Sequence, residues 1–566
     1  MKHTTVPSSR LKLRDPREVM RLERLGASHA TRLSFMRVLL RRLYDENWRF
    51  DVADWQIDPN GVGHAVLAAH GPERSYSLVA FAHDLPAEKR SDRVIATAWD
   101  ATFALHDGVA TAEDIARLRE NVPVQEAGRV SQSELVLSRA NRSVRVFEHV
   151  VDSLAAGRQP DAARVLETGY LMRTTAVYGS AKFGAADRAV IASRPECHAP
   201  FQVEMLNVYL IRWFVTLLVE HLARARGGAR AVGLSPEIAR QLGIGNSTGL
   251  GMAPYLINHP DLLNAWITAR ETAIARVRAL PLATPGAAEA FHLAAARARN
   301  LAEGWRTEHP FQQPRVAQCR ADMARLNAHL QRGGLRGVYP WDRLARWALA
   351  ELSVEGAELT LSLMLEPHGR LVDDLADHLA VPDAGLFVID GSMTVGRLRS
   401  MIAARYDWAL DVDWDRPAAQ ARIWYVSEEK LEPRLGERAE EPLEPWEQPL
   451  APGRDVARLH AALALCADGM SVADFLSDHP QERGSVRRVQ RLAAMPFGEI
   501  RDNTVADTLL PIDMLRTKLA CFGATRFDPR SDRWVRITMF AGAPLPPDLQ
   551  TAGRDRWALS EPVAPS

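Results

Sequence analysis

The residues best suited to chemistry lie between positions 173 and 260. Tyr178 and Lys182 stand four residues apart, and the phenol of Tyr178 could serve as a proton donor or acceptor. Arg173 and Lys182 are cations that could hold a carboxylate or a phosphate. This combination indicates acid/base chemistry on a small anionic organic molecule.

Two histidines are the candidate general bases of this region, because imidazole titrates near neutral pH. They are His198 and His259. Cys197 precedes His198 and could supply a nucleophile. Neighbours in sequence seldom face one another, however, so a buried structural thiol is the simpler interpretation of Cys197.

A glycine-rich segment at 243–251 is a second candidate, Gly-Ile-Gly-Asn-Ser-Thr-Gly-Leu-Gly. Glycines let the backbone approach a ligand closely, and N–H groups at a helix N-terminus suit an anion. The segment matches neither the phosphate-loop nor the dinucleotide pattern, so a helix C-cap followed by a tight turn is the alternative. The residues that we expect to bind substrate here are Gly245, Asn246, Ser247, Thr248 and Gly249.

Polar residues also interrupt the most apolar segment, 201–222. Glu204, Asn207 and Arg212 lie on what would otherwise be a core helix. Buried polar groups need partners, and charges make the segment a poor membrane span. We therefore predict a binding pocket where this helix meets the turn at 173–183 and the loop at 243–259.

The Tyr178-x-x-x-Lys182 spacing resembles the active-site pair of short-chain dehydrogenases. Membership of that family would imply a glycine pattern after a strand and a serine at a set distance upstream of the tyrosine, and the sequence has neither. No motif identifies a cofactor, so the cofactor is unknown. A flavin or nucleotide-dependent oxidoreductase without a standard pattern, and a non-catalytic scaffold that binds a partner protein, remain alternatives to the enzyme.

Metal ligands are weakly indicated. Asp374 and His378, like Glu351 and Glu355, are four residues apart on expected helices, which places each pair on one helical face. Such stripes are more often solvated. We predict no metal site.

The elements around these residues occur twice in the chain. The stretch 171–183 is echoed by 514–527, and 78–93 is echoed by 423–438. Repetition at similar spacing favours an internal duplication. Phe522 stands in the second copy where Tyr178 stands in the first, so only the first copy would carry a working site.

The predicted fold is α+β and predominantly helical, with two weakly similar helix–antiparallel-meander–helix units flanking an all-helical middle domain. Strands are expected between 50 and 84, and helices over 131–178. The expected domains are 1–190, 191–384 with the glycine-rich loop, 385–540, and a flexible tail at 541–566.

Composition narrows the partners. Lys plus Arg and Asp plus Glu both number 70, so no global charge favours nucleic acid or an anionic membrane. Four widely spaced cysteines and an N-terminus without an apolar signal indicate a reduced compartment. We expect a soluble, cytoplasmic, bacterial enzyme for a carboxylate, phosphate or CoA-linked substrate, with a homo-oligomer left open.

Overall fold

The computed structural model describes most of the chain. The described residues are 12–14, 19, 30–90, 98–123, 131–175, 191, 194–199, 201–246, 260–305, 310, 312–377, 379, 389–411, 413–414, 424–427, 433–435, 447–450, 452–486, 489, 519–528 and 536–555. The chain forms two compact units. The larger unit holds 27–248, 277–378 and 518–566, and the smaller unit holds 1–26, 249–276 and 379–517.

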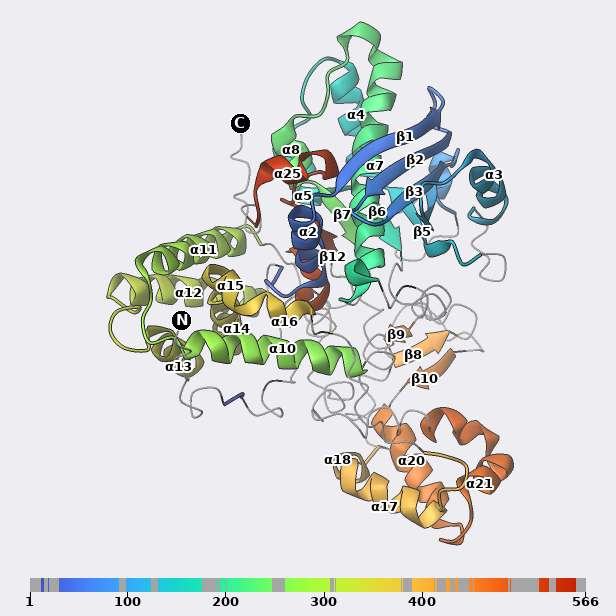
Figure 1. Cartoon of the computed structure of the whole chain (residues 1–566), viewed down its shortest axis with the longest axis vertical. Helices are drawn as coiled ribbons and strands as arrows, with labels where there is room; N and C mark the ends of the chain where they lie inside the picture. Colours follow the sequence, from blue (N-terminus) through green and yellow to red (C-terminus); the bar gives the residue numbers. More distant parts are fainter. Residues whose placement is uncertain are drawn as a thin grey trace. The chain divides into compact units, whose positions relative to one another are not determined.

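A nine-stranded sheet is the centre of the larger unit (Figure 1). Its neighbours are antiparallel except β6 and β7, which run parallel. In spatial order the strands are β1 (Arg49–Ile57), β2 (Gly63–His70), β3 (Ser75–Ala82), β4 (Ala101–Asp107), β5 (Glu134–Arg142), β6 (Tyr170–Thr175), β7 (Gly243–Asn246), β12 (Arg536–Met539) and β11 (Ala524–Asp528). The first three strands form the antiparallel meander predicted for 50–84.

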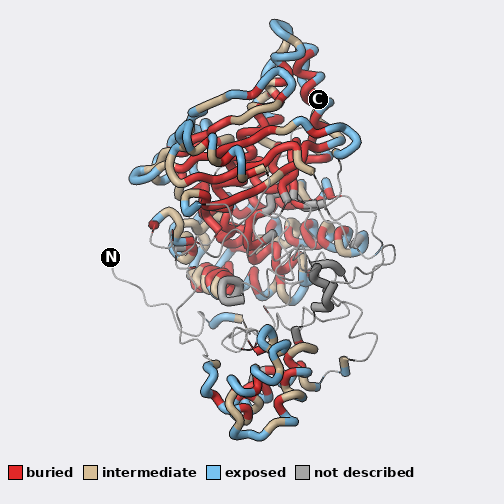
Figure 2. The backbone as a smooth tube through the Cα atoms, turned by 90° about the vertical axis from the view of Figure 1, so that its right-hand side faces the viewer, coloured by how far each residue is buried: buried red, intermediate tan, exposed pale blue. Residues whose placement is uncertain are grey.

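Helices cover both faces of this sheet. Phe103 of β4 packs on Phe214 of α7 (Gln202–Gly227), with ring centroids 5.5 Å apart. The next residue, Ala104, belongs to the apolar cluster under α3 (Ala112–Asn121). Because successive strand residues point to opposite faces, α7 and α3 lie on opposite sides of the sheet. Strands β2 to β5 and helix α7 are largely buried (Figure 2).

Further helices complete the larger unit. They are α2 (Phe35–Asp45), α4 (Phe147–Ala155), α5 (Ala162–Thr168), α8 (Pro236–Gln241), α11 (Pro285–Glu303), α12 (Gln312–Gln331), α13 (Pro340–Glu351), α14 (Val354–Leu363), α15 (Gly369–Val372), α16 (Asp374–Asp377) and α25 (Leu549–Ala552), with short helical turns η3 (Ala87–Lys89), η5 (Pro195–Cys197), η6 (Gly228–Arg230), η7 (Glu366–His368), η9 (Leu519–Gly523) and η10 (Pro546–Asp548). Buried ion pairs join α2 to the segment after α14. Arg37 bonds Glu366 at 2.7 Å, and Arg32 bonds Asp373 at 2.7 Å.

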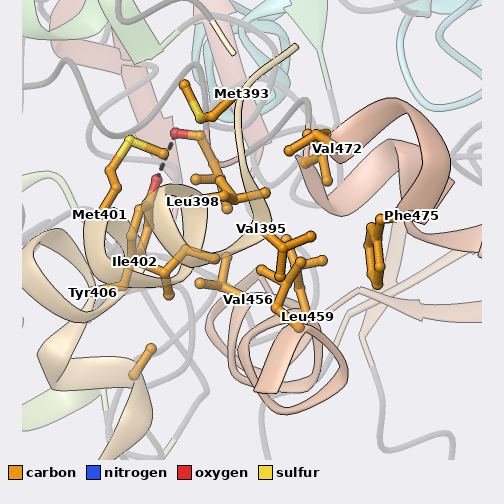
Figure 3. Packing of buried hydrophobic residues seen from close by; sticks show 14 residues of the cluster. Met393, Val395, Leu398, Met401, Ile402, Tyr406, Val456, Leu459, Val472 and Phe475 are labelled. Atoms are coloured by element: carbon orange, nitrogen blue, oxygen red, sulfur yellow. Dashed lines mark hydrogen bonds between the residues drawn. The ribbon is translucent and has the colours of Figure 1, made fainter. Parts of the chain in front are cut away.

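The smaller unit contains a compact helical core (Figure 3). Its elements are α10 (Pro260–Arg278, whose last two residues fall in the larger unit), α17 (Val395–Arg405), α18 (Asp407–Leu410), β8 (Trp424–Ser427), β9 (Pro433–Leu435), β10 (Glu447–Leu450), α20 (Pro452–Ala464), α21 (Val472–Asp478) and η8 (Pro480–Glu482). Fully buried side chains such as Val395, Ile402, Leu459 and Phe475 form the centre of the core. Strands β10, β8 and β9 form a separate antiparallel sheet.

Two helix starts in this core are related by a local two-fold arrangement. The N–H of Val395 donates to the carbonyl of Met470, and the N–H of Val472 donates to the carbonyl of Met393, both at 2.8 Å. Exchanging the residues that lie 77 positions apart, Val395 with Val472 and Met393 with Met470, converts one bond into the other. The side chains of Thr394 and Ser471, also 77 apart, cap α17 and α21.

The helical majority of the predicted fold is confirmed, but several elements differ from their prediction. The segment 131–178 contains strands β5 and β6 as well as helices, because β5 is buried on both faces and shows no alternation. The expected all-helical stretch includes β7, which pairs with β6 and β12. The duplicated units and their boundaries stay predictions. Strands β11 and β12, which lie in the second predicted unit, join the large sheet.

The predicted flexible tail is partly ordered. Leu549 of α25 is buried, and Arg554 bonds Asp45 at 2.9 Å. Asp555 lies 3.0 Å from the guanidinium of Arg32. These contacts fix 541–555, while 556–566 fall outside the described residues.

Candidate functional site

A shallow depression lies beside the N-terminal end of α7; its volume is about 10 Å³, or about 270 Å³ when the open solvent around it is counted. We call it the Tyr76 pocket. Apolar walls and a small number of converging polar groups are typical of ligand sites. Its lining residues are Leu39, Arg42, Leu43, Trp48, Tyr76, Glu196, Cys197, Gln202, Val203 and Leu206.

Three elements of the larger unit position these side chains. Tyr76 lies at the start of β3, and Leu39 and Leu43 come from α2. Glu196 lies on η5, which begins at a proline. Phe201 then takes a positive φ of 59° and turns the chain into α7. The turn and the sheet edge therefore bring residues distant in sequence to one place.

The polar groups of the pocket form a connected chain. The hydroxyl of Tyr76 donates to Oε1 of Glu196 at 2.5 Å. Arg194 donates from Nη1 to the Tyr76 oxygen at 3.1 Å. The same guanidinium makes two bonds to the carboxylate of Asp107, at 2.9 and 2.5 Å. Bidentate pairs of this kind fix geometry as well as charge, so Arg194 holds the phenol in place.

Burial and hydrogen bonding set the protonation states. Burial, followed by donation to Glu196, raises the pKa of Tyr76 well above its usual value. Burial, followed by the charge of Glu196, raises the pKa of Cys197 to about 12. The hydrogen bond to Asp107 raises the pKa of Arg194. At neutral pH the phenol and thiol therefore keep their protons, and the Glu196 carboxylate accepts the hydrogen bond of the phenol.

Trp48 closes one side of the pocket. Its ring stacks on Tyr76 with centroids 6.0 Å apart and an angle of 7° between planes. Gly71 lies against the same indole, and a Cβ added at Gly71 would come within 2.4 Å of a ring carbon. The tight turn after β2 therefore needs glycine so that Trp48 can pack there.

Four residues predicted from the sequence lie on the first turns of α7 or on strands β6 and β7. Arg173 of β6 pairs in register with Gly245 of β7. Asn207 donates from Nδ2 to Oγ of Ser138 at 2.9 Å, and its Oδ1 is buried without a hydrogen bond from any described group. Glu204 is buried one turn earlier on α7. The structure thus gathers these four predicted residues beneath or beside α7.

The side chain of Arg212 holds backbone segments together. Its fully buried guanidinium donates to five backbone carbonyls at 2.7–3.3 Å. These carbonyls belong to Ala239, Arg240, Leu242, Ala543 and Pro544. Arg212 therefore ties the end of α8 and the loop before η10 to α7.

The other predicted site residues are described only in part. His198 is exposed and follows η5, directly after the pocket residue Cys197. The backbone of Asn246 lies in β7, paired with Ile537. Tyr178, Lys182, Ser247, Thr248, Gly249 and His259 fall outside the described residues. The pocket predicted between 173–183 and 243–259 therefore stays a prediction.

No local sequence pattern indicates the Tyr76 pocket. Tyr76 begins an apolar strand, and its partner Glu196 is 120 residues away in the chain. Arg194 and Asp107 are likewise paired across 87 residues. Only a tertiary contact reveals such pairs; Cys197 and His198 were the nearest candidates that sequence reasoning identified.

Comparisons with protein-family models, with curated proteins and with solved structures found no match to this chain. Among the described residues, no group of three or more His, Cys, Asp or Glu side chains could hold a metal ion. One described helix, Gln202–Arg230, is long and apolar enough to cross a membrane, and 89% of its most apolar window is buried inside the protein. A buried core helix passes the same test.

Proposed function

We propose that this protein is an enzyme that binds a small organic molecule in the Tyr76 pocket and exchanges a proton with it through Glu196. The observation that carries this proposal is the hydrogen bond between Tyr76 and Glu196 at the polar end of an apolar depression. A carboxylate that is held by a phenol and open to a pocket is suited to act as a general base.

The charges around the pocket narrow the substrate class. Arg194 is paired with Asp107, and Arg42 is paired with Glu46 at 3.2 Å. The carboxylate of Glu196 has the longest of these pairs, since its Oε1 lies 3.8 Å from Nη1 of Arg74. We infer that the reacting group is a hydrogen-bond donor, an amine or a hydroxyl, on an apolar body that fits against Trp48. The sequence also led us to expect anion binding. In this proposal that role belongs to predicted residues that lie outside the described residues, namely Lys182, Ser247, Thr248 and Gly249.

Each polar residue has a distinct role in this proposal. Glu196 accepts the proton from the substrate, and the Tyr76 hydroxyl donates to the carboxylate and can relay a proton. Arg194 is a positioning residue, because it reaches the substrate only through Tyr76. The thiol of Cys197 keeps its proton, so it lines the pocket as an uncharged group and does not act as a nucleophile.

Thermal unfolding of the full chain with a matched ligand panel tests the proposal. Benzylamine and benzyl alcohol should raise the melting temperature, and benzoate, which has no donor, should not. Ligand at a hundred times its dissociation constant stabilises by about 2.7 kcal/mol. Leu206→Trp, which fills the pocket, should abolish the effect, and Glu237→Gln on the exposed face of α8 should keep it.

The scaffold alternative gives a different result. No shift with any of the three compounds, together with a partner protein that co-purifies with the chain, would favour it over the enzyme. The cytoplasmic location stays a part of the proposal.

A further inference from the structure

We propose that Ser75, His70 and Asp51 form a second, nucleophilic site that cleaves small anionic esters. The three side chains lie on neighbouring strands β3, β2 and β1. Nδ1 of His70 is 3.0 Å from Oγ of Ser75, and its Nε2 is 2.6 Å from Oδ1 of Asp51. A serine, a base and a carboxylate that orients the base are the components of a nucleophilic triad, which is recognised by geometry and not by sequence order.

The hydrogen bonds define the direction of proton transfer. A carboxylate can only accept, so Asp51 takes the N–H of Nε2. Nδ1 of His70 is then the unprotonated nitrogen and faces the hydroxyl of Ser75. This tautomer is the one that removes a proton from the serine. The arrangement is therefore that of an activated nucleophile.

The site is open to a substrate. The His70 side chain is 37% exposed and that of Asp51 is 58% exposed, while Ser75 is half-buried. Because Ser75 and Tyr76 are adjacent on β3, their side chains point to opposite faces of the sheet. The triad is thus separate from the Tyr76 pocket.

Arg49 is a cation beside the triad that can recognise an anionic group of the substrate. It lies in register opposite His70 on β1, as Ser75 does on β3. Residues directly opposite on antiparallel strands share a face, with Cβ atoms about 5 Å apart. Arg49 is exposed and makes no hydrogen bond or ion pair with any residue that the structure describes. Its guanidinium is suited to hold a carboxylate or phosphate group of the ester.

The reaction would proceed by acyl transfer to Ser75. Oγ bonds to the ester carbonyl carbon as its proton passes to Nδ1 of His70. The bond to the alcohol oxygen then breaks, and the alcohol takes that proton. Water attacks the acyl-serine and gives a proton to His70, which returns it to Oγ as the acyl bond breaks. Ester and water become a carboxylic acid and an alcohol, and the side chains are restored.

Labelling of the full chain with a fluorophosphonate, followed by peptide mapping, tests the nucleophile. The label should fall on Ser75, and His70→Ala or Asp51→Asn should slow labelling by about a hundredfold or more. Two controls should label as the wild type does. His64→Gln alters a histidine–aspartate pair at 3.0 Å that shows no hydrogen bond to a serine among the described contacts, and Ser400→Ala removes an exposed helical hydroxyl. The labelled residue is identified in the wild-type protein itself, so misfolding of a variant cannot produce this result.

Ester hydrolysis tests the substrate class. Ser75→Ala should abolish enzymatic cleavage of mono-4-nitrophenyl succinate, and Arg49→Gln should slow this anionic ester more than 4-nitrophenyl acetate. Label on another residue, no label at all, or unchanged hydrolysis in Ser75→Ala would overturn the triad. Equal effects of Arg49→Gln on both esters would overturn the anionic substrate.

Discussion

The hydroxyl of Tyr76 lies 2.5 Å from the carboxylate of Glu196, although 120 residues separate them in the chain. The strand that carries Tyr76 belongs to the sheet, and Glu196 belongs to the turn that leads into α7. Their contact therefore depends on the docking of α7 against the sheet. This one hydrogen bond therefore contributes both to the fold and to the proposed proton transfer.

Loss of the phenol should destabilise the protein. Tyr76→Phe leaves Glu196 and the Nη1 atom of Arg194 without their shared partner in a buried setting. We expect the free energy of unfolding in urea to fall by about 1–3 kcal/mol. Tyr44→Phe, at a partly exposed position of α2, is the control and should change it by less than about 0.5 kcal/mol. Equal losses in both variants would contradict the connected chain of polar groups.

The thiol of Cys197 should react slowly at neutral pH. Burial and the charge of Glu196 hold its pKa at about 12, and the thiolate is the reactive form. Alkylation by iodoacetamide, followed by mass spectrometry, should be far slower than for a small free thiol at pH 8. Glu196→Gln removes one cause of the raised pKa and should speed alkylation. Rapid labelling of native Cys197 at pH 8 would show that the thiol is not held protonated.

Replacement of Arg212 should have a large effect on stability. The guanidinium donates to five backbone carbonyls, so Arg212→Met removes five hydrogen bonds at once, although the carbonyl of Arg240 also accepts from the N–H of Gly542. We expect a loss of about 3 kcal/mol or more, measured by urea unfolding. Arg224→Ala on the same helix removes an exposed i,i+4 ion pair and should cost less than about 0.5 kcal/mol. A small change for Arg212→Met would refute its structural role.

The stability of the larger unit should fall in acid through His368. Burial, followed by the nearby charge of Arg32, lowers the pKa of His368 to about 4. The unfolded chain takes up the proton near pH 6.5, so this stability is complete above pH 6.5 and is lost as pH falls toward 4. Because the ring is partly exposed, we expect a loss of about 1–2 kcal/mol.

A variant isolates this contribution, since other histidines also have lowered pKa values. His368→Phe keeps an aromatic ring beside Trp341, whose centroid is 4.8 Å from that of His368. Its urea midpoint should fall less between pH 6.5 and 4 than that of the wild type. Parallel pH profiles for the two proteins would exclude His368 as the cause.

The two-fold arrangement in the smaller unit predicts equal effects at equivalent caps. Thr394 accepts from the N–H of Arg397, and Ser471 accepts from the N–H of Asp474. Alanine at either position should destabilise its helix by about 1 kcal/mol. Amide hydrogen exchange should show faster exchange in the first turn of α17 or α21 respectively. The exposed Ser477→Ala is the control, and strongly unequal effects at the two caps would argue against their equivalence.

Local patterns predicted part of this fold. The residues Asp58-Pro-Asn-Gly61 are typical of a turn, and in the structure Asp58 accepts from the N–H groups of Asn60 and Val62 while Gly61 adopts a φ of 83°. The start of α3 was equally readable, since Thr111 and Asp114 form a reciprocal cap. Such signals lie within a few residues of the element that they define.

Long-range relationships could not be predicted in this way. Strand β5 is apolar on both faces, so its periodicity resembles that of a buried helix. The three charged or polar residues on α7 were correctly read as buried groups in need of partners, but nothing in the sequence showed that Arg212 would meet backbone carbonyls. The Tyr76 pocket depends on contacts between β3, α2 and η5, which only the folded chain creates.

Titration calorimetry of benzylamine into the full chain and into Glu196→Gln tests the proposed function most directly. A charge-assisted hydrogen bond contributes about 1.5–3 kcal/mol, which corresponds to tenfold or more in affinity. We predict binding to the wild type and a dissociation constant at least about tenfold higher for Glu196→Gln. Equal affinity of the two proteins, or no binding to the wild type, would contradict the proposal that Glu196 receives a proton from a ligand in the Tyr76 pocket.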